Sequence, residues 1–95
     1  MHYLYIIYSG ALDKYYTGES INPLVRLEQH NSHYFKKGFT NAANDWEIVL
    51  TKKCNFKTDA IYLEKFIKRM KSSKFIKKII LNPEILEDIL SKKQL

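Results

Sequence analysis

Cysteine is almost absent from this 95-residue sequence, which contains one, Cys54. A single cysteine excludes an internal disulfide and a zinc site built from several cysteines, and it fits a reducing compartment. Apolar runs are also short, since none approaches the roughly 18 residues that a membrane-spanning helix needs. The first residues lack the basic segment and the small-residue cleavage site of a secretion signal. We therefore expect a soluble, cytoplasmic protein with no membrane partner.

Glycine and proline are scarce as well, at three and two residues. No internal repeat, low-complexity tract or interdomain linker interrupts the chain. The length suits one domain with a modest core and is too short for two. We therefore predict a single domain over residues 1–95, with its core within about 3–83 and a C-terminal helix over about 84–92.

Acidic residues are outnumbered in the second half of the chain. Residues 1–51 carry 4 basic and 5 acidic side chains, whereas residues 52–95 carry 12 basic and 5 acidic ones. Residues 65–78 contain 7 basic side chains and no acidic one, which suits a polyanion such as nucleic acid. A solvated lysine-rich helix face would have the same charge. The side chains that we expect to hold a nucleic-acid backbone are Lys65, Lys68, Arg69, Lys71 and Lys74.

Aromatic and β-branched residues predict strands at 3–8 (YLYIIY) and 46–51 (WEIVLT), and KYYTGES over 14–20 predicts the hairpin partner of the first. If the hairpin connection is Ser9 to Leu12, Tyr5 stands directly opposite Tyr16, and such partners share a face of the sheet. Tyr15 then points to the other face, as a core residue.

Asn22-Pro23 predicts the start of a helix, with asparagine as its cap and proline at the first helical position. The helix continues through LVRLEQHN. Arg26 and His30 are four residues apart and therefore project from the same side of it. The polar residues 31–45 predict a long loop, which in a small domain is often functional.

A second helix is predicted over 58–71, capped by Thr58 or Asp59, with Glu64 at the margin of its apolar stripe. Shorter helices follow at 74–81 and from Pro83. The stripe consists of Ala60, Leu63, Ile67 and Met70, and we expect Trp46, Phe56 and Phe66 in the core. Together these elements predict an α/β (α+β) fold with a small, mainly antiparallel three-stranded sheet flanked by helices.

Four blocks in this order, YLYIIYS, KYYTGES, PLVRLEQHN and YLEKFIK, resemble those of GIY-YIG nuclease domains. The likeness is greatest to small single-domain members similar to the nuclease module of the UvrC excision-repair subunit. Tyr3-Leu4-Tyr5 stands where the first motif has Gly-Ile-Tyr, and Tyr16-Thr17-Gly18 stands for Tyr-Ile-Gly. Arg26 falls eight residues after Gly18, as in the family's helix, and Glu64 matches its acidic metal ligand.

The resemblance implies a metal-dependent endonuclease that hydrolyses DNA, with DNA repair as its setting and branched or damaged DNA among its candidate substrates. It implies one cation, Mg²⁺ or Mn²⁺, held by Glu64 and mostly by water and phosphate otherwise. Arg26 would pair with a phosphate oxygen. A phenol is a weak base at neutral pH, but a nearby cation favours its ionised form, so Tyr16 is our candidate proton acceptor. Tyr5 would position the water or a phosphate oxygen, and His30 would share in proton transfer.

The sequence departs from the family pattern at three positions, and the first two substitutions are variations associated with the single-domain members. Tyr3 replaces the first glycine and Thr17 the isoleucine. Glu19 stands where some relatives have a lysine near the scissile phosphate, and a carboxylate there would repel the DNA backbone. The alternatives are a catalytically weak nucleic-acid-binding module of the same fold and an adaptor for an acidic protein partner. Gly18 is expected to leave space for the substrate backbone beside the strand.

Overall fold

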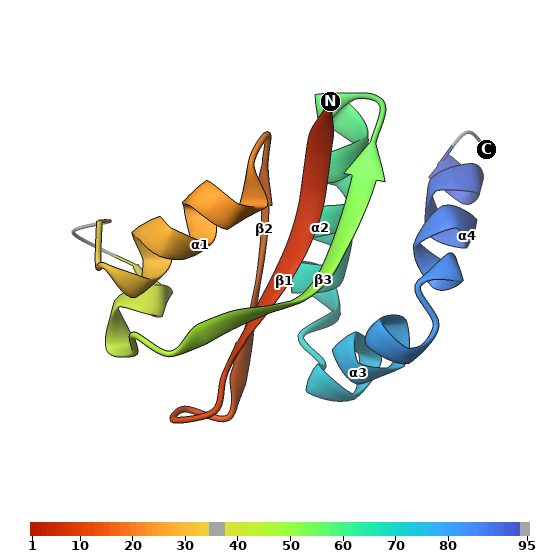
Figure 1. The fold of residues 1–95 in the computed structure, drawn as a ribbon. Helices are drawn as coiled ribbons and strands as arrows, with labels where there is room; N and C mark the ends of the chain where they lie inside the picture. Colours follow the sequence, from red (N-terminus) through yellow and green to blue (C-terminus); the bar gives the residue numbers. More distant parts are fainter. Residues whose placement is uncertain (35–37, 94–95) are drawn as a thin grey trace.

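The computed structural model describes residues 1–34 and 38–93. Three strands, β1 (His2–Ser9), β2 (Lys14–Ser20) and β3 (Trp46–Cys54), form one sheet in the order β2-β1-β3 (Figure 1). Both pairings are antiparallel, which confirms the predicted three-stranded sheet. β3 continues three residues beyond its predicted end. Because β1 is central, β2 presents a free edge within the described part of the chain.

The hairpin register differs from the prediction. The turn spans Gly10–Asp13 rather than Ser9–Leu12, and Tyr5 lies opposite Gly18 instead of opposite Tyr16. The predicted direct pairing of the two tyrosines is therefore wrong. The shift along β2 is two positions, and strand side chains alternate with a period of two, so both tyrosines still lie on one face of the sheet.

Ser9 explains why the turn begins one residue later than expected. Its hydroxyl donates to Asp45 Oδ1 at 2.6 Å and accepts from the Leu12 amide at 3.2 Å, which holds Ser9 within β1. Asp13 then closes the turn with a positive φ of 51°, a conformation that aspartate tolerates better than most residues.

Helices cover both faces of the sheet (Figure 1). On one face α1 (Pro23–Asn31) and the short 3₁₀ helix η1 (Phe39–Ala42) pack near a small core of Tyr5, Ile7 and Trp46. The other face carries α2 (Lys57–Met70), α3 (Ser73–Leu81) and α4 (Glu84–Lys93). The larger core lies there, and its buried members from β1 and the helices are Leu4, Ile6, Ala60, Leu63, Ile67, Ile79, Leu86 and Ile89.

The start of α1 confirms one prediction, and the start of α2 corrects two others, its first residue and its cap. Asn22 caps α1 by accepting from the Val25 amide at 3.2 Å, as predicted. α2 begins one residue early, after Phe56, and no side-chain hydrogen bond caps it, so neither Thr58 nor Asp59 is its cap. Asp59 instead pairs with Lys93 of α4 at 2.9 Å.

The C-terminal end of α2 and the loop before β3 also differ from the predictions. Met70 is 46% exposed, so the buried stripe ends at Ile67, because the chain leaves the helix at Lys71 with a left-handed φ of 49°. Phe56 is exposed and does not join the core. Within the predicted loop over 31–45 lies η1, and residues 35–37 of that loop fall outside the described residues.

Candidate active site

Gly18 makes room for a neighbouring tyrosine, not for a ligand. A Cβ atom at this position would meet the Tyr5 Oη at 2.5 Å and the Tyr5 Cζ at 2.6 Å. The ring of Tyr5 therefore crosses β2 in the space that any side chain at residue 18 would occupy. The expectation that this space accommodates substrate backbone is wrong.

Gly18→Ala will destabilise the protein by about 1–3 kcal/mol, the usual cost of overpacking a filled core site. The added methyl group must displace the Tyr5 ring, which is buried and hydrogen-bonded. Urea unfolding measures the change. Gly38→Ala is the matched control, because nothing lies within 4 Å of a Cβ atom there. Equal stability of both variants would show that the Tyr5 ring does not lie over β2.

A buried hydrogen-bond chain begins at Tyr5. Its Oη lies 2.8 Å from His30 Nε2, and His30 Nδ1 lies 2.8 Å from Thr40 Oγ1. Tyr5 is 1% exposed and His30 3% exposed. Thr40 is held in turn by Trp46, whose Nε1 donates to the Thr40 carbonyl at 2.9 Å. These hydrogen bonds therefore connect β1, α1 and η1 on the side of the sheet that α1 covers.

Burial sets the protonation of both ring groups in this chain. It raises the pKa of Tyr5 well above the ordinary phenol value, with a further rise from the Tyr16 phenol and an opposing effect of Arg26. Burial and then the charge of Arg26 lower the pKa of His30 to about 4. At neutral pH the phenol is protonated and the imidazole is neutral. One nitrogen of His30 then donates and the other accepts, so the chain can carry a proton without holding a charge.

We expect stability to fall as the pH is lowered from about 6.5 to about 4, because the unfolded chain takes up a proton on His30 in this range and the folded chain does not. His30→Gln lacks this titration. The difference in unfolding free energy between wild type and His30→Gln should therefore shrink from pH 7.5 to pH 4.5 in urea titrations. A constant difference between wild type and His30→Gln over this pH range would contradict the assignment.

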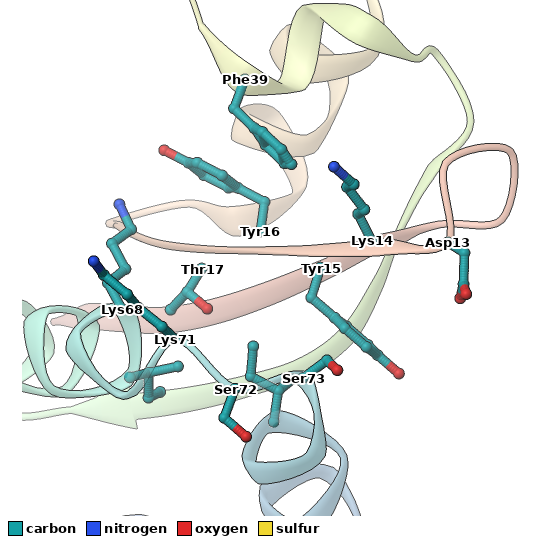
Figure 2. A pocket seen from close by; sticks show the side chains of 12 residues that line it. Asp13, Lys14, Tyr15, Tyr16, Thr17, Phe39, Lys68, Lys71, Ser72 and Ser73 are labelled. Atoms are coloured by element: carbon teal, nitrogen blue, oxygen red, sulfur yellow. The ribbon is translucent and has the colours of Figure 1, made fainter.

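Tyr16 and Glu64 approach each other through Lys68 at the free edge of β2. The Lys68 Nζ lies 2.9 Å from Glu64 Oε2 and 4.9 Å from the centroid of the Tyr16 ring. Tyr16 points to the α1 side of the sheet and its ring meets that of His30 edge-on, 5.2 Å between centroids. Glu64 comes from α2 on the opposite side. Figure 2 shows Tyr16 and Lys68 on either side of β2.

Arg26 and Glu64 act electrostatically on Tyr5. The pKa of Tyr5 is lowered by Arg26 and raised by Glu64 and Glu19. Arg26 also acts on His30. Of the five predicted residues, Tyr5, Tyr16 and His30 are thus in direct contact, and the other two lie within electrostatic range of the Tyr5 phenol. Tyr16, Arg26 and Glu64 are partly exposed, in contrast to Tyr5 and His30.

Glu19 lies close to a histidine side chain. Its Oε2 lies 2.9 Å from His2 Nε2, and both side chains are about one-fifth exposed. By strand alternation Glu19 and Tyr16 point to opposite faces of β2. A protonated His2 would offset part of the repulsion that a carboxylate exerts on a DNA backbone.

The five expected backbone-binding residues lie on α2, at its C-terminal cap and at the start of α3. Lys68 and Lys71 line a pocket at the β2 edge, whereas Lys74 lines a separate hollow on α3 with Lys77 and Lys78. Lys65 is exposed, and the Arg69 guanidinium lies 5.8 Å from the centroid of the Phe66 ring.

Sequence patterns did not predict the contact of Thr40 with His30 or the position of Lys68 next to both Glu64 and Tyr16. The spacing of Glu64 and Lys68, four residues apart on a helix, was the available signal for the second. A lone threonine in a polar loop has no such signal.

Within the described residues, none of the helices has the length and hydrophobicity of a membrane span. Nor do three or more His, Cys, Asp or Glu side chains gather as metal ligands anywhere in residues 1–34 and 38–93. Compared with known families, residues 1–78 match the family model described as the GIY-YIG catalytic domain. No curated protein and no solved structure matches the chain.

Proposed function

Because the chain belongs to the GIY-YIG catalytic domain family, whose members are endonucleases, we propose that it hydrolyses DNA phosphodiester bonds with the help of one divalent cation. The observation that best supports this is the approach of Tyr16 and Glu64, from opposite faces of the sheet, on either side of Lys68. A carboxylate can hold a cation, a phenol can take part in proton transfer and a cationic side chain can offset phosphate charge, so this edge suits water attack on a phosphate ester.

Glu64 fits the role of the single protein ligand to the cation. Its carboxylate is 21% exposed and Lys68 engages one of its two oxygens. Mg²⁺ and Mn²⁺ prefer oxygen ligands, and Mg²⁺ keeps several waters, so one carboxylate with substrate phosphate suffices. When bound, the cation would neutralise charge on the phosphoryl oxygens. Arg26 would add a planar pair of donors to a phosphate oxygen.

Tyr16 is the proposed proton acceptor, because it is the partly exposed phenol of the site. Tyr5 and His30 are too deeply buried to meet a phosphate directly, so we assign them the role of positioning residues. Their hydrogen bond fixes the ring against which Tyr16 packs.

The decisive experiment is nicking of supercoiled plasmid DNA by the purified protein. We expect conversion to the open circular form with Mg²⁺ or Mn²⁺ and none with EDTA, because the proposed chemistry needs the cation to offset phosphate charge. Restoring the cation after EDTA treatment should restore nicking. Equal nicking in EDTA would contradict the metal-dependent mechanism. The UvrC-like pattern would place such an activity in cytoplasmic DNA repair, on branched or damaged DNA.

Glu19 favours a second function, a nucleic-acid-binding module that cleaves weakly. Its carboxylate lies within electrostatic range of Tyr5. Glu19→Lys separates the two functions. If the carboxylate impairs catalysis, this variant will nick faster than wild type at equal DNA occupancy, whereas a fully competent site will show no gain.

A further inference from the structure

An open pocket of about 410 Å³ lies next to Tyr16 at the free edge of β2 (Figure 2). Arg26 and Glu64 are not among its described lining residues, so it extends beyond the groups assigned to chemistry. It wraps around β2, because its walls come from both sides of the sheet. Three of its lining side chains are ammonium groups, those of Lys14, Lys68 and Lys71.

The acidic side chain that lines the same pocket, Asp13, is engaged elsewhere. Its Oδ1 accepts a hydrogen bond from the Tyr8 hydroxyl at 2.6 Å. The ammonium groups outnumber it, so the described lining is net positive. Lys71 also stands at a left-handed position, φ 49°, where glycine is usually preferred. A lysine at this turn places its charge at the pocket wall, at some cost to the backbone.

An exposed aromatic ring forms the other side of the pocket. Phe39 is 46% exposed, although a phenylalanine is costly to leave in water. Its ring is nearly parallel to that of Tyr16, at 21° and 6.3 Å between centroids. The Lys14 Nζ lies 5.6 Å from the centroid of the Phe39 ring. An aromatic ring beside several ammonium groups is the usual composition of a site for single-stranded nucleic acid.

We propose that this pocket binds the nucleotide next to the scissile phosphate and that this nucleotide is unpaired. The inference rests on the proposed nuclease function and specifies its substrate. Lys68 and Lys71 hold the neighbouring backbone phosphate, and the base lies against Phe39. A base within a continuous duplex has both faces covered by its neighbours, so it cannot offer one to Phe39. The protein therefore favours single strands, flaps or frayed ends over intact duplex.

The first test is DNA binding measured by fluorescence anisotropy, in a Glu64→Gln background that prevents cleavage. Phe39→Leu should weaken binding of a single-stranded oligonucleotide by about 10-fold, within the range found for one base–aromatic stack, and leave a blunt duplex unchanged. Phe39→Trp should retain single-strand binding. Phe56→Leu removes an exposed phenylalanine outside the pocket and serves as the matched control. Thermal unfolding of each variant confirms that it is folded.

The second test is the salt dependence of the same binding. Lys71→Gln should reduce the slope of log affinity against log salt by about 0.7 for the single strand, the change expected for one lost phosphate contact. Lys53→Gln, at an exposed lysine of β3, is the control for general charge.

The outcomes for the pocket and for the nuclease are separable. If the wild type nicks DNA but Phe39→Leu binds the single strand normally, or loses single strand and duplex equally, the pocket proposal is wrong and the nuclease proposal stands. If Phe39→Leu loses single-strand binding selectively while no metal supports nicking, the pocket stands as a binding site and the nuclease proposal fails.

Discussion

Replacing Tyr16 with phenylalanine will lower the rate of DNA cleavage by about 10²–10⁴-fold, the contribution typical of a positioned proton-transfer group. Phenylalanine keeps the ring that meets His30, Phe39 and Lys68, so packing should persist. Only the oxygen proposed to accept the proton is lost. The measurement is the single-turnover nicking rate at saturating protein, which separates chemistry from binding.

Tyr15→Phe is the matched control for this loss. Tyr15 is the neighbouring tyrosine of β2, but it points to the opposite face and packs against the larger core. It also lines the pocket next to Tyr16, where phenylalanine keeps the ring. The same chemical change there should leave the cleavage rate nearly unaltered. Full activity of Tyr16→Phe would remove Tyr16 from the mechanism, whereas equal losses in both variants would indicate general damage to β2.

Glu64→Ala is the second large effect that we expect, a loss of cleavage of about 1,000-fold with DNA binding retained. A catalytic cation contributes several kcal/mol to stabilisation of the transition state, and each 1.36 kcal/mol is a factor of ten. The variant also releases Lys68 from its 2.9 Å ion pair, so affinity for DNA should stay equal or rise. Nicking rates over a range of Mg²⁺ and Mn²⁺ concentrations, with anisotropy for binding, measure both quantities.

Two further variants test whether Glu64 acts as a metal ligand or only as the ion-pair partner of Lys68. Lys68→Gln removes the ion pair but leaves the Glu64 carboxylate, and it should retain much more activity than Glu64→Ala. Glu28→Ala removes an exposed carboxylate of α1 and should behave as wild type. If Lys68→Gln and Glu64→Ala lose activity equally, the carboxylate acts by holding the lysine. If Glu64→Ala nicks like wild type, the proposed metal site is wrong.

Local patterns predicted the elements of this fold well. The Asn22-Pro23 start of α1 is visible in sequence because a cap and its proline are adjacent residues. The three strands follow from runs of β-branched and aromatic residues, and the stripe of α2 follows from helical spacing up to Ile67. The stripe failed at Met70, since the helix ended there and the side chain turned to solvent.

The sequence by itself determined the sheet, the helices and the residue types of the candidate site, because alternation, helical spacing and capping depend on neighbours along the chain. Tertiary structure alone decided that the Tyr5 ring occupies the space above Gly18, that Thr40 supports His30, and that Lys68 lies between Glu64 and Tyr16. The physical reason is that these contacts join segments brought together by packing on the two faces of one sheet. Their distances depend on the hairpin register and on the side on which each helix packs.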